Sequence, residues 1–142
     1  MRAEEVLQQA RIENRTFDVV FIDADKKAYK SYLKNLMGEG EGSSSGTCLL
    51  QNGALVIVDN VLWKGMVLNC RDGDNGEEGR HAVLPPENKF VDAMSKKRSE
   101  RQFALARSMH DFNVYVSNHP KLSTVILPIR DGLSCIRYQE KK

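Results

Sequence analysis

Two short apolar runs in this sequence each end in side chains that carry oxygen ligands. Residues 17–22 (FDVVFI) are followed by Asp23, and residues 54–58 (ALVIV) are followed by Asp59 and Asn60. Both runs are too continuous to have one solvated face, which predicts strands buried on both sides in a parallel sheet. Because ligands bind beyond the carboxyl ends of parallel strands, we expect these three polar side chains at one edge of the sheet.

Helical patterns lie between and after these runs. Apolar residues at helical spacing predict helices over residues 3–12 and 27–37. A third helix is predicted to begin at Ser99, where Gln102 completes a capping box. Residues 51–53 (QNG) predict a turn before the second apolar run.

The sequence ends in two more predicted strands, over residues 123–127 and 133–138. The segment between them, PIRDG, is of hairpin length, so these strands should pair antiparallel. Strands with helices between them and a terminal hairpin predict an α/β fold, a three-layer sandwich around one sheet.

Length and composition indicate one domain over residues 1–142, with 41% hydrophobic residues to build a core. Two segments rich in Gly, Ser and charged residues, near 38–46 and 69–89, are predicted to be flexible insertions.

Charge and cysteine content favour a cytoplasmic protein without a nucleic-acid or membrane partner. The 21 basic and 19 acidic residues nearly balance, and no apolar stretch is long enough to span a bilayer. The start of the chain has no signal-peptide core. The cysteines, which show no metal-type spacing, are typical of reduced thiols; they are Cys48, Cys70 and Cys135.

The oxygen ligands at the two strand ends suit a hard divalent cation. Two carboxylates and an amide oxygen favour magnesium, with calcium or manganese as alternatives, over zinc or copper. Lys26 follows Asp23 by three residues. An amine beside a divalent cation has its protonated form disfavoured, so Lys26 is a candidate general base toward a metal-bound hydroxyl.

Each of these residues also has an ordinary structural explanation. An Asp at a strand end often caps a helix, and an Asp-Asn pair is common in turns. A single Lys is usually solvated, and a single Trp such as Trp63 is usually part of the core. The two acidic strand ends taken together favour the metal site.

Three segments of the sequence, taken together, carry a family resemblance. They are Asp23-Ala-Asp-Lys with Tyr29 and Tyr32 following, VDNVLWKG over residues 58–65, and LPIRDGL over residues 127–133. In this combination the chain resembles the cation-dependent O-methyltransferases of the caffeoyl-CoA and catechol type. The resemblance implies a Rossmann-like fold that binds S-adenosyl-L-methionine, and methylation of one hydroxyl of a vicinal diol on a small aromatic substrate.

The resemblance also implies a role for each matching residue. Asp23, Asp59 and Asn60 would be metal ligands, with Asp23 also facing the substrate. Lys26 would be the catalytic base and Asp25 would lie beside the methyl donor. The substrate site would further include the residues that border the acceptor ring, Trp63 and Lys64.

Two departures from the family pattern bear on function. Lys64 stands where the caffeoyl-CoA enzymes usually carry Asn, which argues against an acyl-CoA acceptor of the plant type. No Gly-rich donor-binding motif precedes residue 17. The matching part therefore resembles the carboxyl-terminal half of the fold, with an exposed strand edge at residues 17–22, and we expect this chain alone to be weakly active or inactive.

Two other functions remain open from the sequence. A non-catalytic half-domain could form a homodimer or bind a partner through its bare sheet edge. Alternatively, Asp23 and Asp25 after an apolar strand resemble the nucleophile and acid of haloacid-dehalogenase-like phosphatases. That motif usually continues to Thr or Val, where this chain has Lys26 and Lys27.

Overall fold

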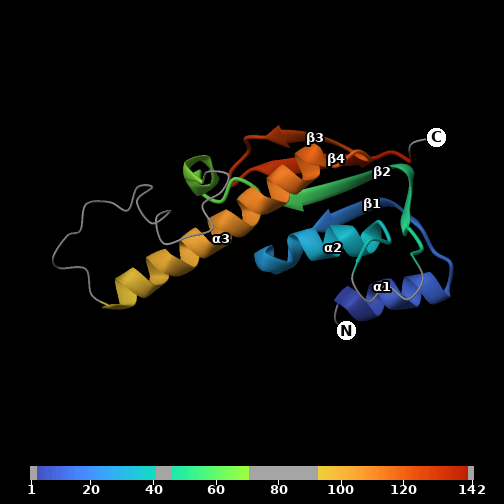
Figure 1. The fold of residues 1–142 in the computed structure, drawn as a ribbon, viewed down its shortest axis with the longest axis horizontal. Coiled ribbons are helices and arrows are strands. Elements are labelled where there is room, and N and C mark those ends of the chain that lie inside the picture. The colour runs from blue at the N-terminus through green and yellow to red at the C-terminus, as the bar shows by residue number, and fades with distance from the viewer. Residues whose placement is uncertain (1–2, 41–45, 71–92, 141–142) are drawn as a thin grey trace.

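The computed structural model describes residues 3–40, 46–70 and 93–140 of the chain (Figure 1). The elements follow the predicted alternation of helices and strands. In chain order they are α1 (Ala3–Ile12), β1 (Phe17–Ile22), the short 3-10 helix η1 (Lys26–Ala28), α2 (Tyr29–Leu36), β2 (Leu50–Asp59), η2 (Met66–Asn69), α3 (Ala93–Asn118), β3 (Leu122–Leu127) and β4 (Leu133–Tyr138).

The four strands form one mixed sheet in the order β1-β2-β4-β3. β1 and β2 are parallel, and β4 is antiparallel to both of its neighbours. The α/β fold class and the terminal antiparallel hairpin are therefore confirmed. β1 lies at the edge of the sheet, as the family resemblance implied.

The register between β1 and β2 brings their carboxyl ends together. Ile22 lies opposite Val58, so the residues that follow them leave the sheet side by side. At the other end the pairing is irregular, because Phe17 lies opposite Leu50 whereas Val19 lies opposite Leu55. The predicted turn at residues 51–53 is thus wrong, since these residues form an irregular stretch inside β2.

Gly53 explains why β2 tolerates this irregularity. Its φ angle of 90° lies in a region that residues with a side chain rarely adopt. The QNG pattern correctly indicated an unusual backbone conformation. It did not mark the start of the strand, because β2 begins before it.

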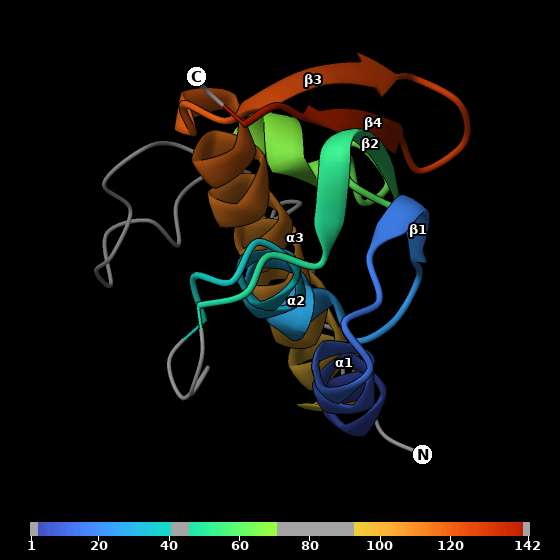
Figure 2. The same ribbon diagram turned by 90° about the vertical axis from the view of Figure 1, so that its right-hand side faces the viewer.

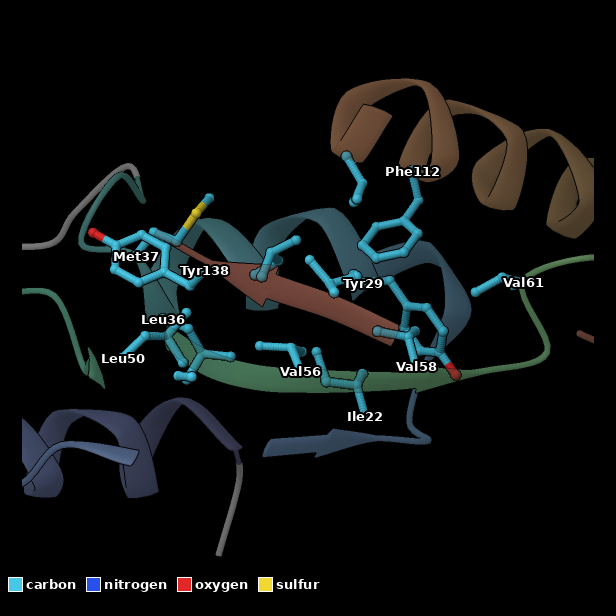
Figure 3. Close-up of a cluster of buried hydrophobic side chains, with 14 of the residues drawn as sticks. Ile22, Tyr29, Leu36, Met37, Leu50, Val56, Val58, Val61, Phe112 and Tyr138 are labelled. Carbon is cyan, nitrogen blue, oxygen red and sulfur yellow. The ribbon is translucent and has the colours of Figure 1, made fainter. Parts of the chain in front are cut away.

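All three α-helices lie on the same face of the sheet (Figure 2). Their apolar side chains meet the buried face of the central strands to form the core (Figure 3). In α3 the fully or almost fully buried residues recur every three or four positions, as one face of a helix requires; they are Ala106, Met109, Phe112 and Val116.

The other face of the sheet is open in the part of the chain that the structure describes. Val19 and Phe21 of β1 are 61% and 60% exposed, and Val125 of β3 is 62% exposed. The prediction that residues 17–22 are buried on both sides is therefore wrong. The described residues supply two of the three expected layers, the sheet and the helices on one face.

The start of α3 also differs from the prediction. The helix begins at Ala93, so Ser99 lies inside it rather than at its amino end. A Ser followed by Gln three residues later fits a helix interior as well as a cap, and the Lys and Arg residues before it are good helix formers.

Two further predictions concern segments that are mostly not described. The insertions expected near 38–46 and 69–89 fall mainly outside the described residues. Within the described part of the chain, no helix combines the length and the apolar character that crossing a membrane requires.

Candidate functional site

The parallel strand ends place the predicted oxygen ligands at one edge of the sheet. Asp23 directly follows β1 and Asp59 is the last residue of β2. The Ile22–Val58 pairing makes these two positions neighbours. The Asp23 carboxylate is 49% exposed, while Asp59 and Asn60 are half-buried. These residues thus lie at the rim of the sheet.

Lys26 lies beside Asp23. Its Nζ is 3.4 Å from Asp23 Oδ1, and only 18% of its side chain is exposed. The same ammonium lies 5.8 Å from the centre of the Tyr29 ring and 5.6 Å from that of the Trp63 ring. An ion pair and two aromatic faces therefore hold this lysine in place.

Asp25 has a structural task in this arrangement. Its Oδ1 accepts a hydrogen bond from the Lys27 backbone N–H at 3.2 Å and so caps η1. This cap turns the chain directly after Asp23 and directs Lys26 back toward the strand end. The predicted contact of Asp25 with a methyl donor stays a prediction.

The loop after β2 has unusual backbone geometry. Asn60, Trp63 and Lys64 all have left-handed φ angles, of 63°, 43° and 57°. Such a conformation costs a non-glycine residue about 1 kcal/mol or more, and it persists only where surrounding contacts hold it. Asp59 Oδ1 accepts the Asn60 backbone N–H at 2.7 Å, which is one such contact.

Further contacts come from the turn between β3 and β4. The Val61 N–H donates to the Gly132 carbonyl at 3.1 Å, and the Leu62 N–H donates to the Asp131 carbonyl at 2.8 Å. Gly132 has a φ of 87°, and a Cβ built on it would lie 2.5 Å from a Leu62 side-chain carbon. Only glycine allows the turn to approach the loop this closely.

The α3 helix holds the same loop from the other side. Asn113 Nδ2 donates to the Val61 carbonyl at 2.9 Å, and Val61 is fully buried. Sequence reasoning missed Asn113, because a polar residue in a long helix gives no sign of its distant partner. For Gly132 the sequence did give a sign, because it is the glycine of the predicted PIRDG turn.

Tyr29 contributes a buried hydroxyl at this end of the sheet. Its ring packs edge-on against Phe112 with the ring centres 5.9 Å apart (Figure 3). The backbone N–H of Ala24 lies near its oxygen, but among the described residues the hydroxyl has no hydrogen-bond acceptor. Burial, followed by the nearby charges of Asp23 and then Asp59, raises the pKa of the Tyr29 phenol to about 12. At neutral pH this phenol is an unused donor near carboxylates.

The donor set fits a hard divalent cation. The described residues contain no group of three His, Cys, Asp or Glu side chains that could hold a metal ion. The predicted set instead combines two carboxylates with the Asn60 amide oxygen, which is chemistry suited to magnesium, calcium or manganese. The Tyr29 hydroxyl has no acceptor among the described residues and so leaves a donor available to a further polar group at this site.

The fold is a mixed α/β domain of the kind found in solved methyltransferase structures. Two solved structures share the fold. The SAH-bound methyltransferase PaMTH1 of Podospora anserina has a TM-score of 0.61 at 20% identity, with 95% of this chain and 47% of that chain aligned. The O-methyltransferase TomG of Streptomyces achromogenes, solved with SAM, has a TM-score of 0.60 at 19% identity, with 98% and 48% aligned.

The sequence assigns the family. The profile of the O-methyltransferase family matches residues 1–139, and the chain belongs to this family. A caffeoyl-CoA O-methyltransferase of Petroselinum crispum is 30% identical over 122 residues, which are 86% of this chain and 37% of that protein. Tricin synthase 1 of Oryza sativa is 26% identical over 138 residues, 96% of this chain and 42% of that protein. The chain thus spans less than half the length of these relatives.

Replacing Tyr29 with Phe tests how the buried hydroxyl affects stability. Because the folded phenol has a pKa of about 12 and the unfolded one about 10, the unfolded chain loses its proton first. The contribution of Tyr29 to the free energy of unfolding should therefore be constant below pH 10 and fall as the pH rises toward 12. Tyr29→Phe should be at least as stable at pH 7 and show a shallower fall, measured by urea unfolding at pH 7, 9, 10 and 11. A steeper fall in the variant would contradict this.

Proposed function

We propose that this chain carries the metal and acceptor half of an O-methyltransferase that depends on S-adenosyl-L-methionine and a divalent cation. The observation that carries the proposal is the β1–β2 register, which sets Asp23 beside Asp59 and Asn60. The Lys26 ammonium at 3.4 Å from Asp23 adds a group able to exchange a proton there. The acceptor in this proposal is a small aromatic diol of the catechol type.

Each residue has a chemical role in this proposal. Asp23, Asp59 and Asn60 would hold the cation, for which magnesium is the first choice, and a cation there would lower the pKa of a substrate hydroxyl. The neutral amine of Lys26 would accept the proton of that hydroxyl, and the resulting oxygen nucleophile would take the methyl group from the sulfonium of S-adenosyl-L-methionine, which leaves as S-adenosylhomocysteine. The Trp63 indole supports the acceptor ring.

Two more residues complete the proposed site. Asp25, at the amino end of η1, faces the methyl donor. Lys64 is exposed beside Trp63 and places a positive charge near the acceptor. Because the chain spans less than half of its relatives, we expect little or no methyl transfer by this chain alone, as transfer requires a fully held donor.

A manganese titration tests the metal site. Asp59→Asn should weaken Mn²⁺ binding at least tenfold, because it replaces a charged ligand by a neutral one. Asp18→Asn, which removes an exposed carboxylate from β1 away from the strand end, is the matched control and should bind as the unaltered chain does. Isothermal titration calorimetry gives the affinities. Equal binding by all three proteins, or no binding by any, would reject the metal site.

The place of Lys26 can be tested in the same titration. The Lys26 ammonium and a divalent cation compete for Asp23, so Lys26→Met should bind Mn²⁺ several-fold more tightly than the unaltered chain. Lys27→Met removes an equal charge from an exposed neighbour and should change the affinity much less. If the two variants behave alike, Lys26 has no specific relation to the metal ligands.

A second function, self-association, is favoured by the open face and edge of the sheet. Val19 and Phe21 expose apolar surface on the edge strand β1, and Val125 and Ile129 extend this surface across β3 and the turn after it. An uncovered strand edge can pair with the same edge of a second copy about a two-fold axis. Large exposed apolar surfaces on soluble domains usually mark interfaces.

Sedimentation experiments test this association. Phe21→Glu should weaken a homodimer at least tenfold, because it places a charge in the paired interface. Ile12→Glu is the control, since Ile12 is 69% exposed and belongs to α1 rather than to the edge strand. Analytical ultracentrifugation over a range of concentrations measures the dissociation constants. A monomeric unaltered chain, or equal effects of both changes, would reject the homodimer.

A further inference from the structure

Val61 anchors the loop that carries Asn60 to the rest of the fold. It is fully buried, and both of its backbone groups bond to other elements of the fold. Its N–H donates to Gly132 in the β3–β4 turn, and its carbonyl accepts from Asn113 in α3. The residue before it, Asn60, has a φ of 63°. The two peptide units that flank Val61 are therefore each held by another element: the unit after Asn60 by Gly132, and the unit before Leu62 by Asn113.

Of these two contacts, the one with Asn113 depends more strongly on the identity of the residue. The contact with Gly132 is between backbone groups, whereas the bond to the Val61 carbonyl depends on a side chain from a residue 52 positions away. Asn is a poor helix former, so its presence within α3 costs some helix stability. Phe112 beside it is fully buried, so this part of α3 is packed against the core.

We propose that Asn113 is a positioning residue for the candidate metal site. By donating to the Val61 carbonyl it fixes the plane of the peptide between Val61 and Leu62, and with the Gly132 contact it keeps Asn60 left-handed. This directs the Asn60 amide beside Asp59. The link to metal binding rests on the proposed function, while the effect on the loop does not.

The alternative is that Asn113 only stabilises the packing of α3. Such a role would lower the melting temperature but leave the loop and the metal affinity of the folded molecules unchanged. The two roles therefore differ in measurements made well below the melting temperature.

The test compares three variants of the full chain. Asn113→Leu keeps the approximate shape and removes the donor. Asn113→His restores an N–H close to the position of Nδ2. Val116→Ala is the matched control, because it removes buried methyl groups from α3 one turn further on and leaves the loop contacts intact. If Asn113→Leu does not fold, Asn113→Asp makes the same comparison.

Two readouts separate the local role from the metal site. Trp63 is the single tryptophan of the chain and lies in the same loop, so its fluorescence reports on the loop directly. Mn²⁺ affinity by calorimetry reports on the site. Loss of a group that orients a metal ligand typically costs 10- to 100-fold in affinity. We expect Asn113→Leu to shift the Trp63 emission and weaken Mn²⁺ binding about tenfold.

The outcomes decide as follows. Recovery of both properties in Asn113→His, with neither changed in Val116→Ala, supports the positioning role. Emission and affinity in Asn113→Leu that match those of Val116→Ala overturn it. If the unaltered chain binds no Mn²⁺, the metal part of the proposed function fails, and the Trp63 emission alone decides whether Asn113 positions the loop.

Discussion

The parallel pairing of β1 with β2 is the constraint on which the candidate site depends. Asp23 and Asp59 are 36 positions apart in the sequence, and they become neighbours because Ile22 lies opposite Val58. A shift of one residue in this register would turn every side chain of β1 to the other face. The buried positions of the two strands, Ile22 on β1 with Val56 and Val58 on β2, fix that register through the core. The chemistry at the rim is therefore set by apolar packing behind it.

The sequence predicted the elements better than it predicted their surroundings. The bounds of β1 and β4 are those expected, because β-forming residues in short runs carry a local signal. The prediction that β1 is buried on both faces was wrong. A continuous apolar run describes a strand that can be covered on both faces, whereas the described residues cover only one face of β1. The turn predicted at the QNG segment was wrong for a similar reason, because Gly53 permits an irregular strand as readily as a turn. Local patterns do not specify distant partners.

The same reasoning separates the predictable part of the site from the rest. Asp23, Asp59 and Lys26 could be proposed from the sequence because each follows an apolar run at a short spacing. Asn113 was missed because its partner, the Val61 carbonyl, is a backbone atom that leaves no mark on the sequence. The left-handed residues of the loop are likewise visible only in the structure. Their strain is held by hydrogen bonds from two other elements, so the loop geometry is a property of the whole fold.

The contacts of Lys26 in the structure conflict with the role of base that the proposed mechanism gives it. Its ion pair with Asp23 and its contacts with the rings of Tyr29 and Trp63 are made by the ammonium, whereas a base must be neutral. The contacts that place the amine correctly thus oppose its proposed role. Of these contacts, only the ion pair with Asp23 involves a formal negative charge. A divalent cation bound to Asp23 would weaken that ion pair. The rings of Tyr29 and Trp63 would then still hold the side chain beside the site, which links the position of the proposed base to the occupancy of the metal site.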